Sequence, residues 1–293
     1  MLDRDTLFRT AAPGASARYS PQASNPGGTT MADEQIRFDD GAAYEDFMGR
    51  WSLLAGNAFL DWLAPAKGLR WLDVGCGNGA FTELLVERCA PASVQGIDPS
   101  EAQVEFARTR LARAAGVDVR TGSAMALPYA DGAFDAVASA LVIFFVPDAP
   151  KAVVEMARVT RPGGGVCAYA WDLLGGGFPY AALQDAMTEL GQEPPMPPHP
   201  EAATLASLRS TWADAGMVDI ETTQLTVKRR FADFETWWAA ARKGPVFAPR
   251  LAGMAGGSSD VLKARLRERL AAAADGSITC SGRATAVRGR KPG

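Results

Sequence analysis

The sequence predicts an α/β fold: a doubly wound, Rossmann-like sheet of seven strands with an antiparallel edge strand, together with helical insertions. Short apolar segments alternate with helical patterns between residues 68 and 172, and a glycine-rich turn follows the first of them. Two longer segments of alternating polarity come later in the chain. Strands that alternate with helices at this spacing pair in parallel through right-handed crossovers.

Five strands and three connecting helices are expected in the first half of the chain. The strands are 70–74, 93–98, 117–122, 134–142 and 165–172, and the helices are 79–88, 100–113 and 148–159. Ser100 and Asp148 are good N-caps for the second and third helices. The RPGGG turn at 161–165 is expected to end the third helix.

The pattern changes after Asp172. Helices are expected at 178–190, 204–215, 231–243 and 259–274, with a rigid proline-rich loop at 193–200. The strands 217–230 and 277–288 are expected to form a hairpin-like antiparallel edge of the sheet. Upstream, apolar residues recur at three-and-four spacing from Tyr44 and predict a helix that ends near Leu63.

The composition excludes several classes of protein. The 293 residues carry 30 Lys and Arg against 33 Asp and Glu, a net charge of −3, which argues against a nucleic-acid partner. No apolar run approaches the ~20 residues that a membrane-spanning helix needs. Four scattered cysteines without a CxxC pair and a single histidine argue against a metal site and a disulfide framework. No secretory signal is recognisable, so we expect a cytoplasmic protein whose oligomeric state the sequence leaves open.

The strongest chemical signal is LDVGCGNGAF at residues 72–81, where a strand turns into a helix. Gly75, Gly77 and Gly79 let a ligand touch the backbone, and the first N–H groups of the helix can face an anionic group. Asp98 ends the next strand about 20 residues on, where a carboxylate can accept both hydroxyls of a ribose. Taken alone, these features suit either a nicotinamide dinucleotide or S-adenosylmethionine.

Further motifs separate these two cofactors. The chain also has GIDPS at 96–100, GSAMALPYADGAFDAV at 122–137 and RPGGG at 161–165. With these motifs, residues 68–172 resemble the class I S-adenosylmethionine-dependent methyltransferases, in particular the broad bacterial ubiquinone/menaquinone methyltransferase-like (type 11) group. The resemblance implies S-adenosylmethionine as cofactor and in-line methyl transfer to a small molecule. It leaves the methyl acceptor open.

Composition and the resemblance together predict how the chain is organised. The richness in Ala, Gly, Ser and Pro predicts a disordered extension at residues 1–30. An N-terminal helical lid follows at 31–67, and the cofactor-binding α/β core spans 68–172. Residues 173–293 supply substrate-side helices and edge strands of the same domain.

Most of the implied cofactor-binding residues lie at the ends of strands. They are Tyr44, Arg50, Trp51, Asp73, Gly75, Cys76, Gly77, Asp98, Pro99, Ser123, Ala124, Ser139 and Ala140. Asp73 is expected to orient the glycine loop and the amino group of the methionine moiety, and Asp98 to hold the ribose. Many relatives have Asp where this chain has Ser123, which carries no charge for the adenine amine.

The substrate side is less specific. Trp171, Phe178, Tyr180 and Trp238 either line an apolar acceptor pocket or pack the late helices against the sheet.

No catalytic residue is identified by the sequence. Asp172 and His199 are weak candidates for a general base, which is needed only if the acceptor must lose a proton. His199 has the one side chain whose unperturbed pKa lies near neutrality.

Two other function classes remain open. One is a non-catalytic cofactor-binding protein on the same fold. The other is a nicotinamide-dependent oxidoreductase, although the sequence contains no Tyr-x-x-x-Lys or comparable hydride-transfer set.

Overall fold

The computed structural model describes residues 45–293, apart from residues 246 and 255–256. These residues belong to one compact unit. The expected disordered extension at 1–30, the first part of the expected lid and Tyr44 lie outside the described residues, so those expectations stay predictions.

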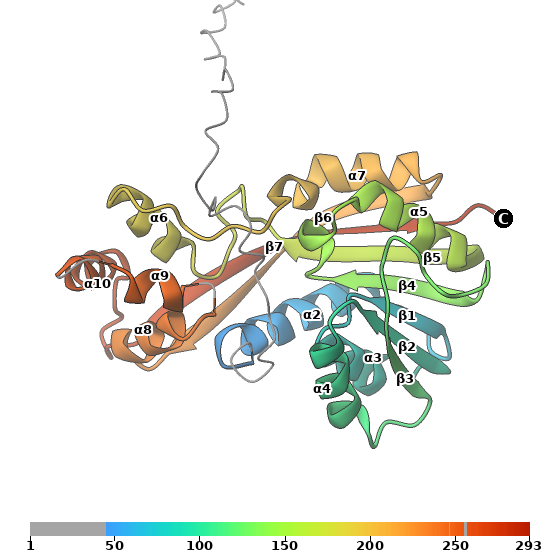
Figure 1. Ribbon diagram of the computed structural model, residues 1–293, viewed down its shortest axis with the longest axis horizontal. Helices are drawn as coiled ribbons and strands as arrows, with labels where there is room; N and C mark the ends of the chain where they lie inside the picture. Colours follow the sequence, from blue (N-terminus) through green and yellow to red (C-terminus); the bar gives the residue numbers. More distant parts are fainter. Residues whose placement is uncertain (1–44, 246, 255–256) are drawn as a thin grey trace, which may run out of the picture. The chain divides into compact units, whose positions relative to one another are not determined.

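The described residues contain a mixed sheet of seven strands (Figure 1). The strands are β1 (Arg70–Val74), β2 (Ser93–Asp98), β3 (Val117–Thr121), β4 (Phe134–Ala140), β5 (Thr160–Trp171), β6 (Val218–Phe231) and β7 (Ile278–Arg290). Their order is β3-β2-β1-β4-β5-β7-β6. The first five strands pair in parallel, whereas β7 runs antiparallel to both β5 and β6. The predicted doubly wound sheet with an antiparallel edge is confirmed.

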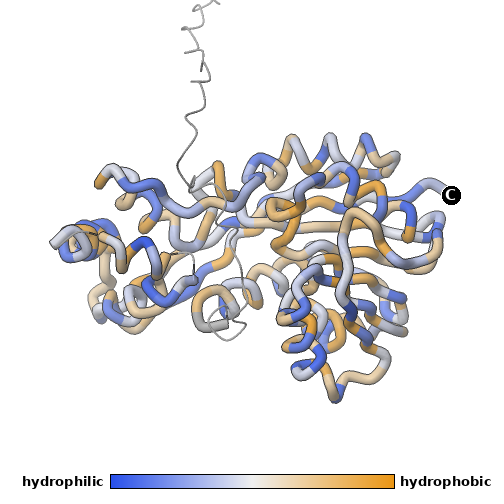
Figure 2. The backbone as a smooth tube through the Cα atoms, viewed as in Figure 1, coloured by the Kyte–Doolittle hydropathy of each residue, from blue (hydrophilic) through white to orange (hydrophobic). Residues whose placement is uncertain are grey.

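Helices cover both faces of this sheet (Figure 1). One face carries α2 (Arg50–Leu63), α3 (Ala80–Cys89) and α4 (Glu101–Leu111), and the other carries α5 (Ala149–Val159) and α7 (Leu205–Asp214). A π-helical turn, η2 (Glu45–Gly49), precedes α2. Ser100 and Asp148 cap α4 and α5, as expected, by accepting hydrogen bonds from the N–H groups of Gln103 and Lys151. Apolar residues concentrate along the strands (Figure 2).

The later helices lie between the last strands in sequence. They are α6 (Ala181–Glu189), α8 (Phe234–Arg242), α9 (Ala248–Ala252) and α10 (Ser258–Arg269). Two short 3-10 turns also occur: η3 (Ile143–Phe145) precedes α5, and η4 (Pro200–Ala203) lies between α6 and α7. The sequence did not predict α9 or η4, which are each no longer than five residues. Among the described helices, none is both long enough and apolar enough to cross a membrane.

One expectation about the strands needs correction. The turn expected at 161–165 lies inside β5, because Thr160 already pairs with Phe134 and the register shifts before Ala136. The β6–β7 pair is antiparallel as expected, and α8 to α10 connect the two strands in the region where helices are expected at 231–243 and 259–274.

The last two strands reach further than their neighbours. Trp171, the final residue of β5, lies opposite Ala284 of β7, so residues 278–283 extend beyond the carboxyl end of β5. There they pair with residues 226–231 of β6. We call residues 226–231 and 278–283 the projecting ribbon. It extends toward α6, α8 and α10 (Figure 1).

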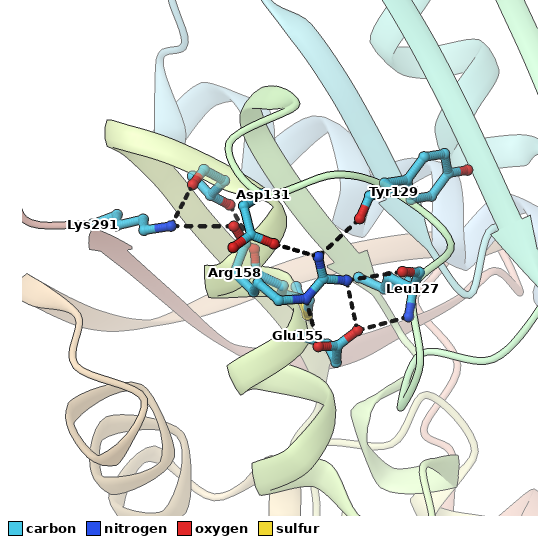
Figure 3. Close-up of polar contacts among 8 residues, drawn as sticks. Leu127, Tyr129, Asp131, Glu155, Arg158 and Lys291 are labelled. Atoms are coloured by element: carbon cyan, nitrogen blue, oxygen red, sulfur yellow. Dashed lines mark hydrogen bonds and ion pairs between the residues drawn. The ribbon is translucent and has the colours of Figure 1, made fainter.

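A polar network fastens the segment after β3 to α5 (Figure 3). The guanidinium of Arg158 donates to the carbonyls of Leu127 (2.9 Å) and Tyr129 (2.8 Å) and pairs with Glu155 (2.7 Å). Glu155 in turn accepts the N–H of Leu127 at 2.8 Å. Asp131 contributes an outer ion pair. The network therefore fixes the chain a few residues after Ser123.

We expect replacement of Arg158 by Met to lower the free energy of unfolding by about 2 kcal/mol, because two carbonyls and a half-buried carboxylate lose their donors. Asp131→Asn is the matched control. Its carboxylate is 78% exposed, and exposed ion pairs contribute less than about 1 kcal/mol. Urea unfolding measures both variants, and equal losses would contradict a special role for Arg158.

Candidate functional site

The described candidate cofactor residues of the core gather at one edge of the sheet. The glycine loop 75–79 follows β1, Asp98 ends β2, and Ser123 follows β3. Ser139 is the second-last residue of β4. These four strands are neighbours in the order β3-β2-β1-β4, and all run in parallel. Their carboxyl ends therefore meet at the place where doubly wound sheets bind ligands, beside the switch between β1 and β4.

The three glycines of the loop serve different purposes. All have positive φ angles, which favour glycine. A Cβ on Gly75 would come within 2.5 Å of Val142, and one on Gly79 within 3.0 Å of Leu111, so both positions are needed for packing. A Cβ on Gly77 would meet nothing closer than the Gln103 side chain at 4.0 Å. The backbone of Gly77 therefore borders open space that a ligand can enter.

Asp98 connects the glycine loop to the end of β2. One carboxylate oxygen accepts the N–H of Gly77 and the other accepts the N–H of Ser100, both at 2.9 Å. Burial raises the pKa of Asp98, while these two hydrogen bonds lower it. Each oxygen keeps a free lone pair, so the carboxylate can still accept two hydroxyl groups.

Asp73 is a fully buried carboxyl group directly beneath the loop. Its Oδ2 atom accepts the hydroxyl of Thr82 at 2.6 Å, whereas its Oδ1 atom is buried without a partner among the described residues. Burial, together with the nearby charge of Asp98, raises the pKa of Asp73 to about 7. A cationic group placed near Oδ1 would satisfy this atom and favour the ionised carboxylate.

The ends of β3 and β4 supply the remaining candidates. The Ser123 hydroxyl accepts the N–H of Met125 at 3.2 Å, which leaves its proton free to be donated. Ser139 is buried and Ala140 is partly buried. The next residue, Leu141, has a φ of 62°, a strained conformation for a bulky side chain. Its N–H donates to Tyr169 on β5 at 2.7 Å, which holds the strained turn in place.

The helix preceding the core packs tightly on it. Trp51 is fully buried, with ring centroids 6.5 Å from both Tyr180 and Phe231. A Cβ on Gly56 would come within 2.8 Å of Leu84, so α2 lies close against α3. Arg50 begins α2 and is exposed. The contacts expected from Trp51 and Arg50 to the cofactor stay predictions.

The predicted substrate-side aromatics are mostly buried. Tyr180 is fully buried, stacks on Phe47 at 4.6 Å and donates its hydroxyl to the Phe47 carbonyl. Phe178, half-buried, lies 6.0 Å from Tyr180 between ring centroids. Trp171 and Trp238 are buried at the end of β5 and in α8. The structure thus joins Phe178 and Tyr180 in one aromatic cluster, and their contact with an acceptor stays a prediction.

The two weak catalytic candidates lie in different settings. Both carboxylate oxygens of Asp172 are occupied: one accepts the N–H of Gly175, and the other pairs with Arg283 at 2.8 Å. This arrangement holds a turn, which is a structural task. His199 is partly exposed, its backbone N–H donates to Phe144 just after β4, and its Nδ1 lies 3.6 Å from Glu201.

Two residues near the loop were not identified from the sequence. Thr82 is the donor to Asp73, and Gln103 borders the open space at Gly77. Gln103 shares the buried face of α4 with Val104 and Ala107, so a polar residue on an apolar face was the available signal. Nothing in the sequence marks Thr82, because its partner lies in the preceding strand.

No three His, Cys, Asp or Glu side chains within the described ranges come together in a way that could hold a metal ion. The four cysteines are unpaired and buried. Burial raises the pKa of Cys76 in the glycine loop well above its usual value, so the thiol is neutral at physiological pH.

Comparison with known proteins finds relatives of the core. Residues 72–168 match a family model described as a methyltransferase domain. The ubiquinone/menaquinone biosynthesis C-methyltransferase of Dinoroseobacter shibae is 38% identical over 112 residues, which are 37% of this chain and 44% of that protein. The demethylmenaquinone methyltransferase of Staphylococcus aureus is 41% identical over 99 residues, 33% of this chain and 41% of that protein. The chain thus spans less than half the length of these relatives.

Solved structures share the fold over most of the chain. The YcgJ protein of Bacillus subtilis has a TM-score of 0.56 at 17% identity, covering 83% of this chain and 99% of that one. Phosphoethanolamine N-methyltransferase 2 of Haemonchus contortus, in complex with S-adenosylhomocysteine, has a TM-score of 0.55 at 20% identity, covering 89% and 60%. At these identities, the likeness concerns the fold.

The role of the open space at Gly77 can be tested by comparing two glycine-to-alanine variants. Gly77→Ala and Gly68→Ala both place a methyl group at a positive φ with no neighbour closer than 4.0 Å. We expect each to lower the free energy of unfolding by about 1–2 kcal/mol. Only Gly77→Ala should weaken binding of S-adenosylhomocysteine, the product of the expected cofactor, in a calorimetric titration. Unchanged binding by Gly77→Ala would remove this loop from the site.

The pKa of Asp73 predicts a pH dependence of binding. An ammonium group at Oδ1 lowers a pKa that is raised to about 7 in the free protein. Below that pH, binding must first remove a proton from Asp73, so affinity falls as the pH falls. We expect the Kd of S-adenosylhomocysteine to be up to about tenfold larger at pH 6 than at pH 7.5. Asp73→Asn should abolish the slope, and a flat profile for the wild-type protein would contradict the assignment.

Proposed function

We propose that the protein is a class I, S-adenosylmethionine-dependent methyltransferase that methylates a small molecule; the match of residues 72–168 to a methyltransferase-domain model supports this proposal. S-adenosylmethionine is the methyl donor of this family. The acceptor and the activity of the whole chain are part of the proposal, because the relatives are matched over less than half of their length.

One observation carries the proposal: two carboxylates with unused hydrogen-bond acceptor sites lie near the accessible backbone of the glycine loop, at the edge where the parallel strands end. The cofactor brings two ribose hydroxyls and one ammonium group, all of which donate hydrogen bonds. Asp98 has two lone pairs available and Asp73 has one unsatisfied buried oxygen. The backbone of Gly77, which donates its N–H to Asp98, borders open space with no side chain closer than 4.0 Å to where a Cβ would lie. The protein therefore offers negatively charged hydrogen-bond acceptors for the two hydroxyl groups and the ammonium group of the cofactor.

The chemistry asks little of acids and bases. Methyl transfer from a sulfonium is an in-line displacement in which the nucleophile forms a bond to carbon while the carbon–sulfur bond breaks. The leaving thioether needs no proton. Holding the reactants in line can supply ~7–11 kcal/mol of the rate enhancement. In the proposed complex, Ser139 and Ala140 face the methyl group from the end of β4, where burial of Ser139 helps to keep water out.

A base is required only for an acceptor that must lose a proton. His199 lies next to the segment after β4, and Glu201 stands near its Nδ1 atom. Asp172 is less suited, because its carboxylate is already paired with Arg283. We therefore propose His199 as the base for a weakly acidic acceptor and no base for an amine or thiolate.

The proposal includes a small-molecule acceptor and a cytoplasmic location. The net charge of −3 supports an acceptor other than nucleic acid. The four free, buried cysteines suit a reducing compartment.

Asp98 provides the central test. A charged acceptor to a hydroxyl contributes ~1.5–3 kcal/mol, so Asp98→Ala should weaken binding of S-adenosylmethionine by about tenfold to a hundredfold. Asp98→Asn keeps one acceptor and should lose less. Asp118→Ala, which removes an exposed carboxylate from β3, is the control and should bind normally. Calorimetric titration with S-adenosylmethionine, S-adenosylhomocysteine and NAD measures all four proteins.

Three results would overturn parts of this proposal. Tight binding of NAD would replace a methyltransferase by an oxidoreductase. Wild-type affinity in Asp98→Ala would remove this carboxylate from the site. Binding of S-adenosylmethionine without turnover, across amine, phenol, thiol and quinol acceptors, would favour a non-catalytic cofactor-binding protein.

A further inference from the structure

The projecting ribbon places one face of β6 and β7 beside the carboxyl edge of the sheet. Arg229 lies opposite Cys280, and Val227 lies opposite Gly282. Directly paired residues share a face of the sheet. A Cβ on Gly282 would come within 3.0 Å of Trp171, the last residue of β5, so Arg229 and Val227 share the face of the sheet that carries the Trp171 side chain.

Arg229 is held among aromatic residues on this face. Its guanidinium carbon lies 4.4 Å from the centre of the Phe231 ring, and Phe231 in turn contacts Trp51 of α2. The Nη1 atom is buried, and no described residue accepts a hydrogen bond from it. A buried donor without a partner calls for a ligand, an ion or a water molecule. Part of the side chain remains accessible, because Arg229 is only half-buried.

A second cation, Arg50, acts on Arg229. Burial is the main cause that lowers the pKa of Arg229; the positive charge of Arg50 also lowers it, whereas Tyr180 and Cys280 raise it. No carboxylate of the described residues pairs with Arg229 or Arg50. Other arginines of the ribbon are paired: Arg230 with Asp275 and Arg283 with Asp172. Within residues 45–293, Arg229 and Arg50 therefore have no carboxylate as a counter-charge.

We propose that Arg229, supported by Arg50, binds an oxyanion on an apolar methyl acceptor, either a carboxylate or a phosphate group. The inference deepens the proposed function and rests on it. A guanidinium matches both oxyanions with two parallel N–H donors. Phe231, which lies under the guanidinium and packs at a tilted angle against Trp51, supplies an apolar surface beside Arg229 for the apolar part of the acceptor.

The test uses three probes of one shape: 3-phenylpropanoate, its uncharged amide and phenyl phosphate. Calorimetry measures their binding to the full chain, with and without S-adenosylhomocysteine. We expect at least one anionic probe to bind about tenfold more tightly than the amide, as a charge-assisted hydrogen bond predicts. The two anions distinguish carboxylate from phosphate.

Variants assign the effect to Arg229. Arg229→Gln should abolish the preference for the anion. Arg229→Lys, which keeps the positive charge but loses the two parallel N–H donors of the guanidinium, should retain part of this preference. Lys228→Gln is the matched control, because it removes an exposed cation one residue away, on the opposite face of the strand. This variant should keep the full preference. Thermal unfolding confirms that each variant is folded.

The outcomes separate this inference from the proposed function. Equal affinity for acid and amide, or a preference that survives Arg229→Gln, overturns the anion site. A preference that is lost in Lys228→Gln overturns it as well. Because the ribbon is separate from the glycine loop, an anion preference without any binding of S-adenosylhomocysteine would support the anion site while the methyltransferase proposal fails.

Discussion

The end of β2 fixes the position of the whole candidate site. The carbonyl of Ile97 accepts the N–H groups of Gly75 and Cys76 at 2.7 and 3.0 Å, and the carboxylate of Asp98 accepts that of Gly77. The glycine loop therefore takes its shape from the neighbouring strand. The same carboxylate is the group proposed to hold a ribose, so the position of the loop and the recognition of the ligand depend on one side chain.

Most of the core could be predicted from the sequence because its signals are local. Each short apolar strand, each N-cap such as Ser100, and the glycine motif are readable within about ten residues. The position of the site then follows from topology, since neighbouring parallel strands end at one edge. The proposed roles of Asp73 and Asp98 rest on this placement together with the family resemblance, and their burial and partners add the detail that Asp73 has one unsatisfied oxygen.

The rest depends on contacts between distant parts of the chain. Asp172 stands beside the strand end as a catalytic residue would, but its partner Arg283 lies 111 residues away in sequence. The alternating pattern of β6 predicts a strand but cannot show that Arg229 lies over Phe231 and pairs with no carboxylate of the described residues. The predicted start of β5 at residue 165 was wrong, because the glycines of RPGGG, which are typical of a turn, also permit an irregular strand. Such features appear only when register and packing are known.

The insertion of β7 between β5 and β6 has a consequence for how the chain is made. In the finished sheet, β5 and β6 each pair with β7, which is synthesised after both. Until residues 278–290 leave the ribosome, β5 presents an unpaired, largely apolar edge, and β6 has nothing to join. At about 5–20 residues per second, this edge is exposed for seconds. Open edges of this kind recruit other strands, so the nascent protein has a period in which a chaperone's protection matters most.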